Sequence, residues 1–80
     1  MNTAELPLDQ LPVGASAVVH RLAGGSDLTQ RLAALGLTVG APFVVLQNSR
    51  RGPLLVSVRD SRIALGRGEA AKILVQRTDR

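Results

Sequence analysis

The chain has 80 residues and a mass of 8.4 kDa, which is enough for one small domain. Its 45% hydrophobic and 20% charged residues are typical of a globular protein rather than a disordered one. Cysteine is absent, which excludes disulfides and thiolate metal sites. Phe43 is the single aromatic residue, so the chain lacks the ring clusters that bind proline-rich peptides, methylated lysines or unpaired nucleic-acid bases.

The basic residues are scattered along the chain. A net charge of +4 and a pI near 11.5 would suit a nucleic-acid or membrane-surface partner. However, Arg50–Arg51 is the only adjacent basic pair, and scattered charge is more typical of a solvated surface. The longest apolar run, Ala41–Leu46, is too short to span a bilayer, and the first residues lack a signal-peptide pattern. We therefore expect a soluble, cytoplasmic protein that binds no nucleic acid.

A short internal repeat marks the start of two strands. Leu11–Ala15 and Leu37–Ala41 match at four of five positions, and an apolar segment follows each copy. A glycine before a β-branched run predicts a turn that leads into a strand. The first of these strands ends before Gly24–Gly25, and the second covers Phe43–Gln47. The chain thus uses the same turn and strand twice.

One helix is predicted between the two copies, over Asp27–Leu35. Ser26 or Asp27 can cap its start, and with Asp27 as the cap Gln30 completes a capping-box-like pair. Gly36 then follows the helix, and Leu37 is expected to pack back on its last turn in a Schellman motif. A single apolar stripe is formed by Leu28, Leu32 and Leu35.

The rest of the chain predicts short strands. A polar loop, Asn48–Pro53, separates the second strand from an alternating segment that continues past a tight turn at Asp60–Ser61. A single helical turn at Glu69–Ala71 precedes a last strand, Lys72–Arg77. The order β, α, β, β, β, β predicts a mainly β fold, namely a small SH3-like barrel of about five strands in which the helix follows the first strand. One domain is expected over residues 8–77, with loose termini at 1–7 and 78–80.

No catalytic constellation is visible, so we expect no enzyme and no cofactor. His20 is the only histidine, and we interpret it as a partly buried, hydrogen-bonded strand residue; a metal or pH-sensing role is the alternative. Gly24–Ser26 precedes a helix but lacks the lysine and spacing of a nucleotide-binding loop. The six carboxylates show no spacing suited to general acid–base catalysis; they are Glu5, Asp9, Asp27, Asp60, Glu69 and Asp79.

The segment Leu28–Gly40 reads Leu-Thr-Gln-Arg-Leu-Ala-Ala-Leu-Gly-Leu-Thr-Val-Gly. It resembles the signature L-x-x-R-L-x-x-L-G-L-x-x-G of the FeoA family, small accessory proteins of bacterial ferrous iron transport. The resemblance covers residues 8–76, including Leu11–Gly14, Gly24–Gly25, Ile63–Leu65 and a closing element that is similar over Ala70–Val75. It implies an SH3-like fold and a non-enzymatic role at the cytoplasmic membrane face, through contact with the FeoB transporter and its GTP-hydrolysing domain.

The resemblance leaves three hypotheses of function. The first is a protein-contact module for a FeoB-type transporter. The second is a sensor or chaperone that binds Fe²⁺ or another transition metal weakly through His20 and nearby carboxylates. The third is a DNA- or repressor-associated regulatory module, because the domain is also similar to the C-terminal module of diphtheria-toxin-repressor-type repressors. A monomer and a weak dimer both remain open. Candidate contact residues are Arg31, Ala34, Gly36, Leu37, Gly40, Arg50, Arg51, Arg59 and Arg62.

Overall fold

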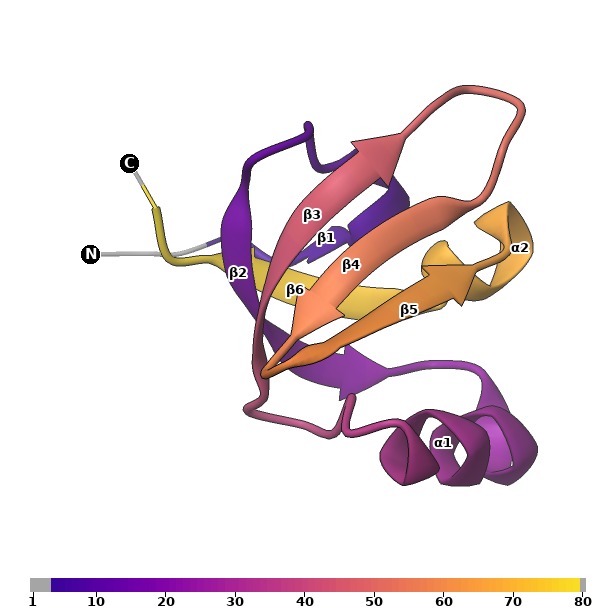
Figure 1. Cartoon of the computed structure of the whole chain (residues 1–80). Helices are drawn as coiled ribbons and strands as arrows, with labels where there is room; N and C mark the ends of the chain where they lie inside the picture. Colours follow the sequence, from indigo (N-terminus) through magenta and orange to yellow (C-terminus); the bar gives the residue numbers. More distant parts are fainter. Residues whose placement is uncertain (1–3, 80) are drawn as a thin grey trace.

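The computed structural model describes residues 4–79. Its six strands form one strongly bent antiparallel sheet in the order β1-β6-β2-β3-β4-β5 (Figure 1). The strands are β1 Leu6–Pro7, β2 Ser16–Leu22, β3 Pro42–Asn48, β4 Leu54–Val58, β5 Ser61–Leu65 and β6 Ile73–Arg77. The helices are the 3-10 turn η1 Leu8–Gln10, α1 Gly25–Ala34 and the short α2 Arg67–Ala70.

The predicted fold class is confirmed, with one strand more than expected. The additional strand, β1, has two residues and pairs with β6 through Leu6 opposite Val75. At the other end the Thr78 N–H donates to the Ser16 carbonyl at 2.9 Å. The described parts of the segments expected to be loose are therefore bonded to the sheet, while residues 1–3 and 80 lie outside the described range.

The internal repeat forms two equivalent turns at opposite ends of the β2–β3 pair. The Gly14 N–H donates to the Val45 carbonyl of β3 at 2.8 Å, and the Gly40 N–H donates to the Val19 carbonyl of β2 at 2.7 Å. Both glycines have a positive φ, +91° and +88°, a conformation that other residues adopt only at a cost. The pair thus has a local pseudo-twofold symmetry centred on Ala17 opposite Phe43.

The bulges obey the same symmetry. The pairing of β2 with β6 shifts register between Val19 and Arg21, and the pairing of β3 with β4 shifts between Val45 and Gln47. His20 and Leu46 hold equivalent places in these bulges, and both are exposed. Because a bulge bends and twists its strand, two equivalent bulges curl the sheet from its centre toward both edges.

Helix α1 ends as predicted but begins differently. The Leu37 N–H donates to the Leu32 carbonyl at 2.9 Å and the Gly36 N–H to the Ala33 carbonyl at 3.0 Å, which is the Schellman pattern. At its start no side chain caps the helix, because the N-cap position is Gly24 rather than Ser26 or Asp27. The predicted capping box is therefore wrong.

Aliphatic side chains from the concave face of the sheet, from η1 and from both helices form one core. Phe43 belongs to it and is 3% exposed, so the single ring is not available at the surface. Leu35 departs from the predicted apolar stripe, since it is 47% exposed while Leu28 and Leu32 are buried. Among the described residues no polar or charged side chain is fully buried. Packing of aliphatic groups, and not internal polar bonding, therefore stabilises the core.

Two short elements are displaced from their predicted places. The turn between β4 and β5 consists of Arg59 and Asp60, since Val58 pairs with Ser61. The short helix begins at Arg67, two residues earlier than predicted, because the Glu69 carboxylate accepts a hydrogen bond from the Gly66 N–H at 3.0 Å.

The pseudo-symmetry predicts that Gly14→Ala and Gly40→Ala destabilise the fold equally, by about 1–2 kcal/mol each, because a Cβ at either position meets no atom and only the backbone conformation is penalised. Gly68→Ala is the matched control: its Cβ also meets no atom, but its φ is ordinary, so no loss of stability is expected. Urea unfolding of the three variants measures the effect. Unequal costs at Gly14 and Gly40 would contradict the equivalence of the turns.

Candidate functional site

His20 lies on the outer surface at the β2 bulge. Its Nε2 is 3.4 Å from Oε2 of Glu5, and its side chain is 46% exposed, more than strand alternation predicts. Among residues 4–79 no three His, Asp or Glu side chains lie close enough together to hold a metal ion. Glu5 is the one carboxylate that forms a close pair with His20 in this part of the chain.

Glu5 is held mainly by Arg21. The guanidinium donates two hydrogen bonds, from Nη2 to Oε1 at 2.8 Å and from Nε to Oε2 at 3.2 Å. These bonds lower the pKa of the Glu5 carboxyl, and the nearby positive charges act in the same direction. The pKa of Arg21 is raised by the same contact. The pair fastens the segment before β1 to β2.

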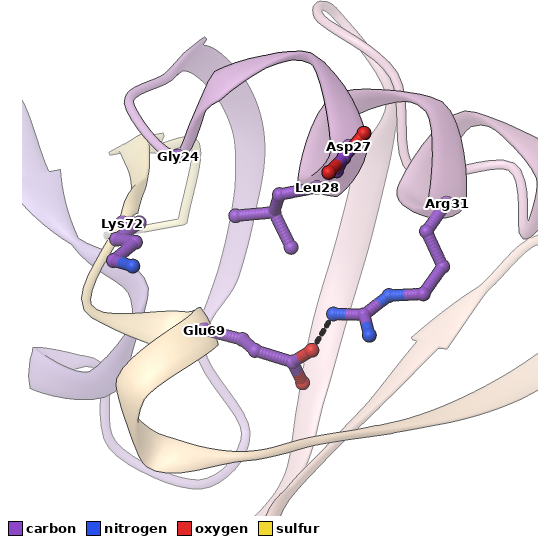
Figure 2. A pocket seen from close by; sticks show the side chains of 6 residues that line it. All are labelled: Gly24, Asp27, Leu28, Arg31, Glu69 and Lys72. Carbon is purple, nitrogen blue, oxygen red and sulfur yellow. Dashed lines mark ion pairs between the residues drawn. The ribbon is translucent and has the colours of Figure 1, made fainter.

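The predicted contact residue Arg31 lies between the two helices. Its guanidinium forms an ion pair with Glu69 of α2, and Figure 2 shows this pair spanning the space between them. The pair borders a hollow of about 340 Å³ that is lined by Gly24, Asp27, Leu28, Arg31, Glu69 and Lys72. Arg31 is therefore engaged within the fold, and its role in partner binding stays a prediction.

The other candidates at the end of α1 differ in exposure. Ala34, Gly40 and, in part, Gly36 reach the surface. Leu37 does not: it is completely buried, because the Schellman turn directs it into the core, so its predicted role as a contact residue is wrong. Sequence reasoning missed two neighbouring side chains that do reach solvent, Leu35 at 47% and Val39 at 64% exposure.

Arg50 and Arg51 lie on the β3–β4 loop, which another arginine holds in place. The Arg67 guanidinium donates to the Asn48 Oδ1 at 2.9 Å, to the Gly52 carbonyl at 3.2 Å and to the Ser49 carbonyl. The Asn48 amide in turn donates to the carbonyls of Asp9 at 3.1 Å and Leu11 at 2.6 Å. This network joins η1, the loop and α2, and it was not foreseen from the sequence.

Arg59 and Arg62 lie at the other end of β4. Arg59 occupies the β4–β5 turn with a φ of +55°, and it is the only non-glycine residue with a positive φ in the described chain. Arg62 pairs across the sheet with Ser57. Arg59 also borders a second hollow, of about 240 Å³, on the outer face where β2, β3 and β4 meet.

The predicted contact residues thus fall into two regions. The end of α1 lies beside the β4–β5 turn, since a Cβ at Gly36 would be 3.8 Å from a methyl group of Val58. Arg59 and Arg62 belong to this region, whereas Arg50 and Arg51 lie at the opposite end of β4 (Figure 1). No helix in the described part of the chain is long and apolar enough to cross a membrane.

Comparison with known proteins identifies the domain. The family model described as FeoA domain matches residues 6–77. The chain is 36% identical over 70 residues to the "Putative Fe(2+) transport protein A" of Methanocaldococcus jannaschii, an alignment that covers 88% of this chain and 84% of that protein. The chain belongs to the FeoA family.

Solved structures agree with this assignment. A crystal structure of an iron uptake regulatory protein (FeoA) superposes with a TM-score of 0.87 and 34% identity, over 92% of this chain and 99% of that one. The solution structure of the FeoA protein of Chlorobium tepidum superposes with a TM-score of 0.85 and 31% identity, over 92% of this chain and 71% of that one. A manganese-dependent transcriptional repressor superposes with a TM-score of 0.85 and 19% identity, over 96% of this chain and 44% of that one. At this identity the likeness is one of fold alone.

The residues of the FeoA signature mainly hold helix α1 against the sheet. Its leucines at 28, 32 and 37 are buried, and its glycine at 36 permits the Schellman turn. Its arginine, Arg31, pairs with Glu69. In this FeoA chain the signature therefore consists mainly of residues that fix α1 against the sheet, and it does not by itself mark a ligand site.

The lowered pKa of Glu5 predicts a stability that depends on pH. A carboxyl whose pKa is lower in the folded than in the unfolded chain stabilises the fold at any pH above its pKa in the unfolded chain. This contribution disappears as the pH falls through its pKa in the folded chain. Glu5→Gln should therefore be less stable than the wild type at pH 7 and equally stable at pH 2. Thermal unfolding measures this, with Asp60→Asn as an exposed control. A difference that persists at pH 2 would contradict the prediction.

The network around Arg67 predicts that Arg67→Ala loosens the β3–β4 loop and costs about 1–3 kcal/mol, because the Asn48 side chain and two loop carbonyls lose a charged donor. Amide hydrogen exchange in residues 49–52 should accelerate. Arg50→Ala removes the same side chain from an exposed position of the same loop and should change stability by no more than about 0.5 kcal/mol. Unchanged exchange in Arg67→Ala would contradict the assigned role.

Proposed function

We propose that this chain is a cytoplasmic accessory protein of ferrous iron uptake that acts by contact with a FeoB-type membrane transporter and its GTP-hydrolysing domain. The match to the FeoA domain over residues 6–77 carries the proposal. The name of the M. jannaschii relative, "Putative Fe(2+) transport protein A", supports a role in ferrous iron transport. Ferrous iron is then the cargo of the transporter and not a resident group of this chain.

Features of the surface support a role in protein contact. The side chains of Leu35 and Val39 reach solvent near the end of α1, and Arg59 and Arg62 lie in the same region without a carboxylate partner among the described residues. The buried core of a protein interface is more apolar than the rest of the surface, and arginine is enriched in interfaces. A rigid small domain with such a surface is suited to binding and needs no reacting group.

The metal-sensor alternative has weaker support. Its candidate ligand, His20, pairs with Glu5, whose two oxygens already accept hydrogen bonds from Arg21. Exchange of these bonds for a metal would break the contact that fastens the N-terminal segment to β2. The DNA-associated alternative depends on a likeness of fold at 19% identity, which carries no function.

The proposal predicts that cells without this chain take up radioactive Fe²⁺ slowly under anaerobic conditions, and that the wild-type gene restores uptake. The chain should also co-purify with the detergent-solubilised transporter. Leu32→Asp is the negative control, because a charge at this completely buried position unfolds the domain. The same assay on a deletion of the transporter alone shows whether the two act together.

Normal uptake without the chain, together with no association, would refute the proposal. Heat released on titration with anaerobic Fe²⁺, and lost in His20→Ala, would instead favour the metal-binding alternative.

A further inference from the structure

We propose that the hollow on the outer face of the sheet, where β2, β3 and β4 meet, binds a carboxylate and the adjoining apolar side chain of a protein partner. This inference rests on the proposed function, since it names the surface and the partner chemistry for that contact. The hollow has a volume of about 240 Å³, and its lining includes Ser16, Pro42, Val44, Ser57, Arg59 and Thr78. This is smaller than the usual site for a small-molecule ligand and suits one or two side chains.

The polar part of the lining is suited to an anion. Three residues that carry hydroxyl groups, Ser16, Ser57 and Thr78, line the hollow together with Arg59. A guanidinium presents two parallel N–H donors that match the two oxygens of a carboxylate, and hydroxyls can add further donors. Arg62 stands across from Ser57 on the same outer face, because Ile63 and Leu65 beside it point into the core. Arg59 thus lines the hollow, and Arg62 lies next to one of its lining residues.

These two cations are not neutralised by neighbours. Neither Arg59 nor Arg62 pairs with a carboxylate among the described residues. Asp60 shares the turn with Arg59 and forms no ion pair with any residue that the structure describes. Asp79 follows Thr78, but its oxygens already accept bonds from Arg77 and from the Ser16 N–H. The site therefore retains positive charge for an incoming group.

The apolar part of the lining lies directly beside these donors. Val44 is 37% exposed in the middle of β3, flanked across the sheet by Ser16 on one side and Ser57 on the other. Pro42 extends the apolar surface toward the turn that precedes β3. A carboxylate on Arg59 would place the next side chain of its chain over Val44 and Pro42.

Charge decides which occupant fits. A second copy of this chain would bring its own unpaired arginines to the site, and the chain has a net charge of +4. Nucleic acid could use the arginines but leaves Val44 and Pro42 without a contact, since its backbone offers phosphates. A protein segment with an acidic residue beside an aliphatic one satisfies both halves of the hollow.

The test uses the ¹⁵N-labelled full chain at low salt and the capped peptide Gly-Ser-Asp-Leu-Asp-Leu-Ser-Gly as the probe. Saturable amide shifts are expected at Ser16, Val44, Ser57, Arg59 and Thr78, and these shifts should shrink at high salt. The same peptide with Asn or Lys in place of Asp should give no saturation. Absence of saturable shifts at these residues, or equal shifts with the Lys peptide, would overturn the proposal.

Arg59→Asn is the decisive variant, because asparagine tolerates the positive φ of the turn and the fold is retained. It should weaken peptide binding by about tenfold or more, as expected for loss of a charge-assisted bidentate bond. Arg50→Asn removes the same charge at the far end of β4 and should leave binding unchanged. An equal loss in both variants would mean that net charge alone attracts the peptide, and would overturn the site.

Three further measurements distinguish the proposal from the other possible occupants and from failure of the proposed function. Inorganic phosphate that displaces the peptide and reproduces its shift at Val44 would show an anion site only and overturn the proposal. Tighter binding of a DNA duplex at the same residues, or dimerisation through them in sedimentation, would do so as well. If the wild-type chain does not associate with the transporter, the proposed function fails; if wild type and Arg59→Asn associate equally, this inference alone fails.

Discussion

The pairing of β2 with β3, closed at each end by a glycine turn, is the constraint on which the rest of the structure depends. Each turn bonds to the opposite strand through the N–H of its glycine, Gly14 or Gly40. The register of the two strands is therefore set from both ends. Because β6 pairs with β2 and β4 with β3, this central pair also sets the position of the flanking strands. A slip by one residue would turn every inward side chain of the pair to the solvent.

The bulges at His20 and Leu46 explain how so small a sheet encloses a core. Each bulge lies at the same distance from the centre of the pair, on the side that faces the flanking strand. The curled sheet then needs only aliphatic side chains to fill its interior, with Phe43 as its single ring. Polar contacts lie instead at the margins: Glu5 with Arg21 beside the first strand, and Arg31 with Glu69 between the helices.

Features that depend on residues close together in the sequence could be predicted from it. The helix end at Gly36, the alternation of β4 and β5 and the repeated turns each depend on neighbours within a few residues, and each prediction holds. The helix start was not predictable, because Ser26 and Asp27 both satisfy the capping pattern while the chain uses Gly24 as the cap. A two-residue strand that contains Pro7 likewise leaves no periodic signal.

The candidate site was less predictable because long-range pairing assembles it. Ser16, Val44 and Ser57 become neighbours only through the registers of three strands, and nothing in their local sequence joins them. The sequence indicated arginines as candidate contact residues, but it could not show which of them pair with carboxylates inside the fold. Leu37 was selected wrongly because a signature residue can be fixed by packing as well as by contact. The exposure of Leu35 depends on the exact rotation of α1, which spacing alone does not determine.

The structure sorts the arginines by partner. Arg21, Arg31 and Arg77 pair with carboxylates and fasten the chain ends and the helix, while Arg67 binds loop carbonyls. The four that lack such partners among the described residues all lie in the segment from the β3–β4 loop to β5: Arg50, Arg51, Arg59 and Arg62. Of these, Arg59 holds a turn conformation that costs an ordinary side chain about 1–2 kcal/mol and that glycine or asparagine would adopt more easily. This conformation gives arginine no advantage in stability over glycine or asparagine at this place. The proposed carboxylate site offers a reason for the arginine, because its guanidinium borders the adjoining hollow and can form a bidentate bond with a carboxylate.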